Sequence, residues 1–263
     1  MSREPDERRA LICALLAVLC WSTVATAFKL SLAVASPLQL LTWASVTATL
    51  ALALALPSGG RWQALVSSPL RDWGWSLCLG LLNPVLYYAV LFAAYDRLPA
   101  QEAQSLNYTW AFVLALLSVP VLGHRLTRWD ALGGSLAYAG VVVIATRGRV
   151  LDWDFADPAG VTLALASTVL WAGYWLLTAR DRRDPLLALF MGFAAGTPLL
   201  LLWSWLEGVL WLSARGYAGA VYVGVMEMAL PFALWLTAMR ATGRTARIGM
   251  LIFLSPFLSL VFI

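Results

Sequence analysis

The polar side chains with a capacity for chemistry in this sequence lie within long apolar runs. Glu227 stands nine residues into one such run, and Asn83 occupies the equivalent place in an earlier run. A carboxylate at the centre of a bilayer costs about 2.5–3.5 kcal/mol on insertion scales, so Glu227 must face a cavity, find a partner or take up a proton. We expect it to contact a substrate amine or to couple a proton; the alternative is a protonated carboxyl that joins two helices. Asn83 cannot ionise, so it is either a binding contact or a structural polar contact.

A second group of polar side chains lies in the run 100–122. At 100° per residue, Gln104 and Tyr108 share the small and polar face of a helix, whereas Trp110 lies about 200° from Tyr108. We therefore expect Gln104 and Tyr108 to face inward. Asn107 lies at the edge of this face, where it either joins a binding site or bonds the next helix.

Aromatic residues form the third group of candidates. Trp21 and Trp171 lie midway along apolar runs, away from the membrane interfaces where tryptophan is usually enriched. Helical spacing places Tyr174 and Trp175 on the same face as Trp171. An aromatic lining offers rigid contact area to a flat or apolar side chain, and a few polar groups then fix the rest of a ligand. The alternative for each ring is packing against lipid or a neighbouring helix.

Two prolines stand near the paired polar positions. Pro84 follows Asn83 directly, and Pro231 follows Glu227 by four residues. Because proline removes a helix hydrogen bond and can bend the chain, we expect these helices to bend and to gate a cavity. The alternative is packing without a gating role, since proline is common in membrane helices. Tyr87 shares the helix face of Asn83 and is a further binding candidate.

The elements that must position these residues are membrane-spanning helices. Hydrophobic residues make up 61% of the 263 and charged residues only 12%, which excludes an ordinary soluble domain. Nine apolar runs follow one another along the chain. They are 10–28, 38–56, 73–94, 100–122, 131–145, 159–179, 186–206, 218–239 and 246–263. The connections are too short to hold a soluble domain, so we predict an all-α integral membrane protein.

The composition excludes several kinds of chemistry. His124 is the only histidine, and Cys13, Cys20 and Cys78 lie in apolar runs without paired spacing. A metal cluster or a serine triad cannot be assembled in any ordinary form, so we expect no metal, no cofactor and no enzyme activity. The sequence has no nucleotide-binding loop, which excludes ATP hydrolysis by this chain. The net charge of +4 is spread over short loops and provides no basic face for a nucleic acid.

The basic residues predict the orientation. Most of the 18 lysines and arginines fall in the N-terminal tail and in every second connection. Those on the other side are Lys29, Arg97, Arg147, Arg149 and Arg215. By the positive-inside rule, we expect a multi-pass protein whose N-terminus is cytoplasmic.

The chain contains an internal repeat. A shift of 144 positions sets Asn83 on Glu227 and Gly80 on Gly224. Five spans per copy place the second copy upside down, because an odd number of crossings ends on the opposite side of the membrane.

We therefore predict a ten-helix bundle of two inverted five-helix repeats, residues 1–146 and 147–263. The second copy contains only four spans, so we expect a tenth helix to follow Ile263.

Several motifs carry a resemblance to a known family. The first is Trp21-Ser22 midway along the first helix. The second is Pro120 in the fourth span, with a corresponding proline in Ser255-Pro256 of the last span. The third is the glycine-rich fifth helix G-G-S-L-A-Y-A-G-V-V-V-I-A. With two five-helix copies, the chain resembles the EamA-type branch of the drug/metabolite transporter superfamily. Within it, S-L-N-Y-T-W and Tyr87-Tyr88 resemble the YddG-type exporters of aromatic amino acids.

The resemblance implies Trp110, within S-L-N-Y-T-W, as a further substrate contact. One departure is the pair Gly123-His124, which stands where the family usually has a glutamate after the fourth span. The role of that glutamate is therefore not carried over to this chain.

We expect a secondary transporter of the bacterial cell inner membrane that exports amino acids, with aromatic ones favoured. It would work by alternating access around a central aromatic-lined cavity. Its partners would be a small-molecule substrate and the lipid bilayer, and we expect a monomer. The alternatives are another cargo on the same fold, such as threonine, homoserine, a purine or a cationic drug, and, in a different class, a membrane enzyme or a sensor.

Overall fold

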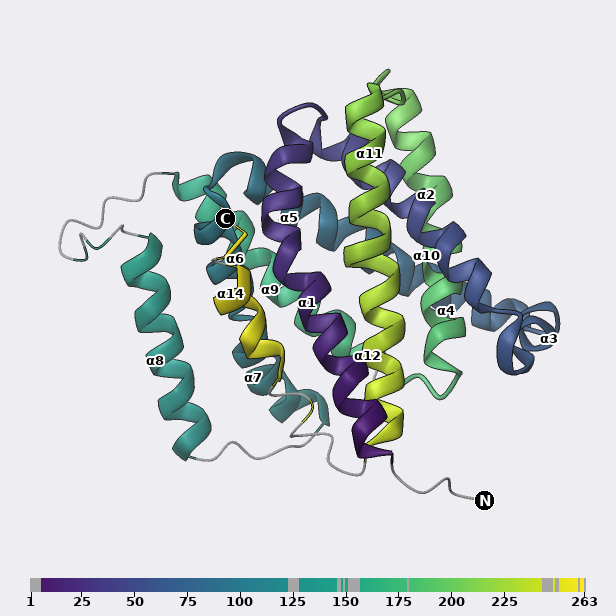
Figure 1. The fold of residues 1–263 in the computed structure, drawn as a ribbon, viewed down its shortest axis with the longest axis horizontal. Coiled ribbons are helices and arrows are strands. Elements are labelled where there is room, and N and C mark those ends of the chain that lie inside the picture. The colour runs from purple at the N-terminus through teal and green to yellow at the C-terminus, as the bar shows by residue number, and fades with distance from the viewer. Residues whose placement is uncertain are drawn as a thin grey trace.

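The computed structural model describes residues 6–122, 128–145, 148, 150, 157–178, 180–242, 248, 251–259 and 261–262, and every regular element within them is a helix. The first half contains α1 (Glu7–Leu32), α2 (Pro37–Ala55), η1 (Ser58–Gly60), α3 (Arg61–Val66), α4 (Leu70–Gly80), η2 (Leu81–Leu86), α5 (Tyr87–Arg97), α6 (Ala100–Asn107), α7 (Trp110–Leu122) and α8 (Arg128–Ala145). The second half contains α9 (Pro158–Thr178), α10 (Pro185–Leu206), α11 (Ala214–Val223), η3 (Gly224–Ala229), α12 (Leu230–Ala241), η4 (Leu251–Phe253) and α14 (Leu254–Ser259). They form one bundle, with α8 at its edge (Figure 1).

Six described stretches have the length and hydropathy of membrane spans. They are Glu7–Leu32, Pro37–Ala55, Leu70–Arg97, Pro158–Thr178, Pro185–Leu206 and Ala214–Met239. Each corresponds to an apolar run predicted from the sequence. The remaining predicted runs correspond to α6 with α7, to α8, and to η4 with α14.

Polar residues in the connections start several of these helices. Asp6 accepts a hydrogen bond from the backbone N–H of Arg9 at the start of α1. Ser36 and Gln39 form a reciprocal capping box at the start of α2. Asp184 accepts two backbone N–H groups at the start of α10. These contacts satisfy donors that a helix start otherwise leaves without partners.

Two long helices are interrupted by π-helical turns. η2 joins α4 to α5, and η3 joins α11 to α12. In η2, Asn83 has φ −146° and ψ 114°, outside the helical region, directly before Pro84. In the second half, Pro231 lies in the first turn of α12, just after η3. Both prolines therefore lie where the regular α-helix is interrupted.

The shift of 144 positions also relates the element boundaries. It carries the start of α4 at Leu70 onto the start of α11 at Ala214. It carries the start of α7 at Trp110 onto the start of α14 at Leu254. η2 and η3 depart from this register by a single position. The two halves thus share the order of these helices and the positions of their breaks.

Glycines allow a close crossing of α4 and α10. α10 packs against α4 and α2, α9 against α5 and α7, and α1 against α12. A Cβ atom at Gly196 would lie 2.9 Å from the carbonyl oxygen of Gly80, so this crossing requires glycine. The G-x-x-x-G spacing of Gly192 and Gly196 thus joins two helices of one bundle.

One end of the bundle gathers the start of the described chain and many of its arginines. The backbone N–H of Asp6 donates to the carbonyl of Ala241 at 2.9 Å, which joins the start of α1 to the end of α12. Arg61 pairs with Asp184 at 3.0 Å, which joins the starts of α3 and α10. This end, called the N-terminal end below, lies at the bottom of Figure 1.

Candidate functional site

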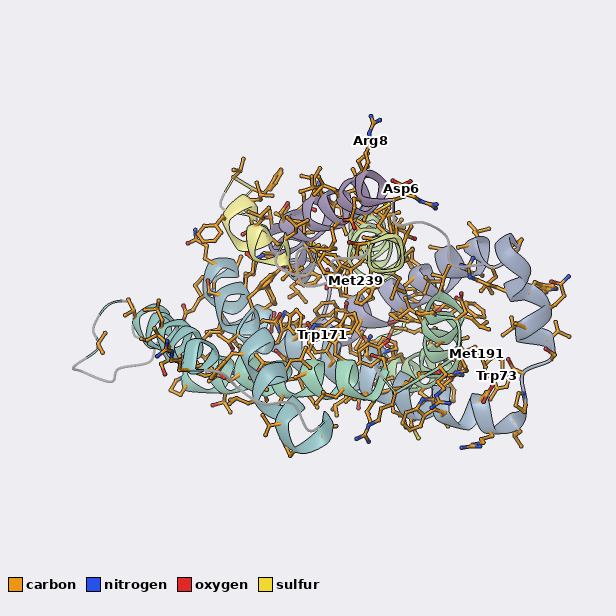
Figure 2. All side chains as sticks on the ribbon, turned by 90° about the horizontal axis from the view of Figure 1, so that it is seen from below. Asp6, Arg8, Trp73, Trp171, Met191 and Met239 are labelled. Carbon is orange, nitrogen blue, oxygen red and sulfur yellow. The ribbon has the colours of Figure 1, made fainter. Side chains whose placement is uncertain are left out.

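A cavity of about 70 Å³ lies inside the bundle, and we call it the central cavity. The predicted binding residues that line it are Trp21, Tyr87, Gln104, Asn107, Tyr108, Trp110, Trp171, Trp175 and Glu227. The rest of the lining is mostly apolar: Val24, Ala25, Phe28, Leu91, Tyr95, Trp235 and Ile252. In the end-on view of Figure 2, Trp171 lies near the middle of the molecule. Residues from α1, α5, α6, α7, α9, η3, α12 and η4 thus converge on one internal site.

The aromatic wall of the cavity is organised around Trp171, which is only 7% exposed. Its ring stacks on Tyr87, with centroids 4.4 Å apart and an angle of 22° between the planes. Trp175 and Phe232 contact the same ring edge-on, at 5.8 and 5.6 Å. The ring of Trp21 contacts Phe232 edge-on at 5.7 Å. Since stacked and edge-on pairs are favourable, rings from α1, α5, α9 and α12 hold one another in place.

Glu227 contributes a carboxyl group to the cavity surface. The Tyr88 hydroxyl donates a hydrogen bond to its Oε1 at 3.0 Å. The indole N–H of Trp21 donates to its backbone carbonyl at 3.4 Å. Glu227 lies in η3, where the π turn departs from the regular backbone ladder, as is frequent at functional sites. Both contacts come from the first half of the chain, so the carboxylate lies at the contact between the two halves.

The last turn of α6 and the residue that follows it bring three polar side chains to the cavity. Tyr108 donates through its hydroxyl to Ser255 Oγ at 2.7 Å. Ser259, one helical turn further along α14, donates to Gln104 Oε1 at 2.5 Å. Asn107 reaches α9 instead, because its Nδ2 donates to Ser167 Oγ at 2.8 Å. The two alternatives for Asn107 are therefore combined, since it lines the cavity and also bonds a neighbouring helix.

Trp110 also lines the cavity, which corrects the prediction that it faces away from Tyr108. α6 ends at Asn107, and α7 begins at Trp110. Between them Thr109 leaves the regular helix, and its hydroxyl donates to the carbonyl of Leu106 at 2.8 Å. The prediction assumed 100° per residue without interruption, and the break changes the direction of every side chain after Tyr108.

The family follows from comparison with known sequences. A sequence model of the EamA-like transporter family matches residues 8–146 and 158–263, which is nearly the whole chain. The chain belongs to the EamA-like transporter family. The family predicted from the sequence motifs is therefore confirmed.

Relatives of this EamA-like transporter support the same class. It is 26% identical over 233 residues to an uncharacterized transporter of Archaeoglobus fulgidus, covering 87% of this chain and 74% of the relative. It is 31% identical over 122 residues to the inner membrane protein YtfF of Escherichia coli, covering 43% of this chain and 38% of YtfF. One solved crystal structure has a TM-score of 0.68 at 24% identity, over 96% of this chain and 86% of that chain, which shows a shared fold.

Two predicted binding residues of this EamA-like transporter do not line the central cavity. Asn83 is buried in η2, where its backbone is non-helical, so it does not share a regular helix face with Tyr87. Tyr174 lines a second pocket together with Asp181 and Arg183. On a helix, Tyr174 lies about 100° from Trp175, so the cavity meets only one side of α9. The prediction had treated this stretch of α9 as a single face.

The two prolines predicted to gate the cavity are not part of its lining. Pro84 is buried against the α4–α10 crossing, where its Cδ would lie 3.2 Å from a Cβ atom at Gly196. Pro231 lies in the first turn of α12, also buried. Gly123 and His124, where the chain departs from the usual family motif, lie outside the described residues.

Several residues at the EamA-like transporter's cavity were not among the predicted binding residues. Tyr95 was detectable, because positions 87, 91 and 95 are four residues apart and share one helix face. Trp235 stands eight residues after Glu227, about two helical turns along the same face. Tyr88 and Ser255 entered the prediction only as parts of motifs, and their contacts connect helices distant in sequence.

Proposed function

We propose that this EamA-like transporter exports amino acids from the cell, with aromatic ones favoured. The observation that supports the proposal is the central cavity itself, in which stacked rings surround one carboxylate and two amides. The ring of an aromatic amino acid would pack against Tyr87 and Trp171. Its ammonium group would meet Glu227, and its carboxylate would meet side-chain N–H donors.

We assign the indole N–H of Trp175, whose side chain lines the cavity, as the donor for the cargo carboxylate. The Nε1 atom is buried, and it has no hydrogen-bond partner among the residues that the structure describes. A buried donor without a partner costs roughly 1–3 kcal/mol. A cargo carboxylate in the cavity would provide that partner, which adds affinity for a zwitterion over an apolar solute.

Transport requires the cavity to open. Its volume of about 70 Å³ is well below the roughly 300–1,000 Å³ of typical ligand pockets. We infer alternating access between two inverted repeats, residues 1–146 and 147–263, in a bundle of ten helices. Support comes from the family match, which falls separately on 8–146 and 158–263, and from the shared breaks at η2 and η3. In this account, Pro84 and Pro231 mark the bends at which the helices move.

The orientation follows from the basic residues. The N-terminal end carries Arg61, Arg71, Arg180, Arg182 and Arg183 among the described residues. By the positive-inside rule, this end faces the cytoplasm in the inner membrane. We assign the cavity one cytoplasmic and one periplasmic route, opened in turn.

Binding of labelled phenylalanine to the purified full-length chain tests the proposal. A scintillation-proximity assay would compare phenylalanine, tryptophan, threonine, a purine and a cationic dye as competitors. We expect tryptophan to displace the label at least ten times better than threonine. Displacement by the dye alone would contradict the proposal and favour a cationic drug as the cargo.

A further inference from the structure

A surface pocket of about 600 Å³ lies at the N-terminal end, apart from the central cavity. It is formed by the first turns of α4 and by the connection from α9 to α10. Its lining consists of Arg71, Asp72, Gly74, Trp75, Cys78, Arg180, Asp181, Arg182 and Arg183. Four arginines face two aspartates, so the pocket has an excess of positive charge.

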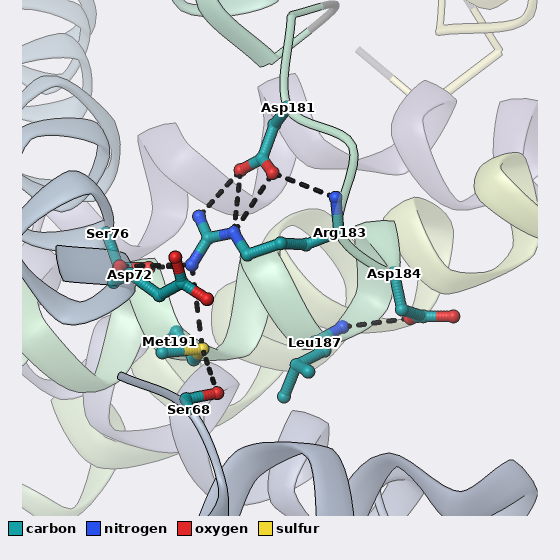
Figure 3. A network of polar contacts seen from close by, with 8 residues as sticks. All are labelled: Ser68, Asp72, Ser76, Asp181, Arg183, Asp184, Leu187 and Met191. Carbon is teal, nitrogen blue, oxygen red and sulfur yellow. Dashed lines mark hydrogen bonds and ion pairs between the residues drawn. The ribbon is translucent and has the colours of Figure 1, made fainter. Parts of the chain in front are cut away.

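One arginine of the pocket, Arg183, joins the α9–α10 connection to α4. Arg183 pairs with Asp181 at 2.6 Å and also donates to Ser76 Oγ at 2.8 Å and to the Asp72 carbonyl at 3.0 Å (Figure 3). Burial raises the pKa of the Asp181 carboxyl, but the hydrogen bonds and charge of Arg183 outweigh burial and hold it below its usual value. Asp181 therefore stays ionised at neutral pH, and it neutralises Arg183.

The other three arginines point their charge outward. Arg71, Arg180 and Arg182 are exposed. Arg180 is anchored by a hydrogen bond of 2.6 Å to the carbonyl of Val121. With the pair of Arg183 and Asp181 neutral, three guanidinium groups remain against the single carboxylate of Asp72. Guanidinium groups recognise phosphate oxygens through paired hydrogen bonds.

The pocket continues into an apolar surface along α4. Trp75 and Leu77 of α4 are 37% and 40% exposed, Leu81 at the start of η2 is 44% exposed, and Cys78 is also exposed. Gly74 has no side chain, and a Cβ atom there would meet no other atom within 4 Å. The space beside this residue is therefore open. A ligand at this place would hold a phosphate among the arginines and lay its acyl chains along α4. An exposed tryptophan beside basic residues is typical of the membrane interface.

We propose that this pocket binds the headgroup of an anionic phospholipid. Basic pockets between membrane helices at the cytoplasmic side are suited to such headgroups. Because its walls come from α4 in the first half and from the α9–α10 connection in the second half, a bound lipid holds the two halves together at this end. The proposal is independent of which cargo occupies the central cavity.

Native mass spectrometry of the purified full-length chain tests it with phosphatidylglycerol and phosphatidylcholine as probes. We expect phosphatidylglycerol to bind at least fivefold more tightly than phosphatidylcholine. The double variant Arg71→Gln/Arg182→Gln is expected to lose that preference. The matched control Arg215→Gln, on α11 at the opposite end, is expected to keep it. Equal binding of the two lipids, or an equal loss in the control, would overturn the proposal.

Two further measurements locate the site and identify the ligand class. Photoactivatable phosphatidylglycerol should label the peptide that contains Trp75 and Cys78 in the unmodified protein, so the test does not depend on the folding of a variant. Labelling confined to other peptides would overturn the assignment. Inorganic phosphate at millimolar concentration should leave lipid binding unchanged. Full displacement by phosphate would instead indicate a site for a soluble anion.

Discussion

Tyr88 and Glu227 lie 139 positions apart in the sequence and are joined by a hydrogen bond of 3.0 Å. Each residue lies in an interrupted helix, Tyr88 just after η2 and Glu227 within η3. The bond therefore connects the corresponding helices of the two halves at the edge of the central cavity. This contact is where binding of a cargo amine and movement of the two halves would be coupled.

Replacing Glu227 tests its proposed contact with the cargo amine and the expectation that it couples a proton. Glu227→Gln keeps the shape and still accepts from Tyr88, but it removes the charge. Since a hydrogen bond to a charged group is worth about 1.5–3 kcal/mol, we expect cargo affinity to fall roughly 10–100-fold. Labelled phenylalanine binding measures the change, and any acceleration of uptake by an imposed pH gradient should also disappear. Uptake that responds to the gradient as before would remove the proton role.

Tyr88→Phe is the matched control for the hydrogen bond. It removes the donor and leaves both the charge and the ring. We expect binding to weaken only about 2–10-fold, as for a typical hydrogen bond of about 0.5–1.5 kcal/mol. A loss as large as that of Glu227→Gln would show that Tyr88, rather than the charge, determines binding.

The break between α6 and α7 leads to a prediction for two aromatic residues. Tyr108 and Trp110 both line the cavity, so Tyr108→Ala and Trp110→Ala should each weaken aromatic cargo. Aromatic pairs contribute about 0.5–1.5 kcal/mol, which corresponds to a loss of about 2–10-fold for each variant. Competition with threonine should change much less. Trp205→Ala, at an exposed position on α10, serves as the control and should bind as the unmodified protein does.

The positions of most spans and most of the cavity residues could be predicted from the sequence, because hydrophobic runs and helical periodicity determine them locally. The direction of Trp110 could not, since a break at Thr109 has no strong local signal. Asn83 was misplaced for a different reason: Pro84 indicated a bend, but the face of Asn83 was assigned from an uninterrupted helix, and its backbone leaves the helical region. The bonds from Arg183 to Ser76 and to the Asp72 carbonyl join a loop to α4, and local sequence patterns carry no information about such contacts.

Substitution by alanine should change the thermal stability differently at two glycines of α10. At Gly196 a Cβ atom would lie 2.9 Å from the Gly80 carbonyl oxygen, whereas at Gly192 the nearest atom would lie 3.8 Å away. Overpacking typically costs about 1–3 kcal/mol, so Gly196→Ala should lower the midpoint of thermal unfolding while Gly192→Ala leaves it nearly unchanged. Equal effects of the two substitutions would contradict the helix crossing described here.

The ion pair at the N-terminal end predicts a pH-dependent stability. The side chains of Arg183 and Asp181 are 15% and 7% exposed. In Asp181→Asn, Arg183 keeps its bonds to α4 but loses its charged partner. We therefore expect the free energy of unfolding to fall by about 1–3 kcal/mol at pH 7.

The sign of the pH effect follows from the lowered pKa of Asp181. A carboxyl whose pKa is lower in the folded state stabilises it above the ordinary value of about 3.9, and this contribution is lost as the pH falls through the lowered pKa. The difference in thermal midpoint between the unmodified protein and Asp181→Asn should therefore shrink below about pH 4. Glu207→Gln, at an exposed position away from this ion pair, is the control for the loss of a surface carboxyl.

Flux of labelled phenylalanine into proteoliposomes that contain the unmodified chain tests the central claim most directly. We predict saturable flux that unlabelled tryptophan inhibits more strongly than threonine does, and that falls at least tenfold in Trp171→Ala. Flux equal to that of protein-free liposomes, or equal in Trp171→Ala and the unmodified protein, would contradict transport of aromatic amino acids through the central cavity.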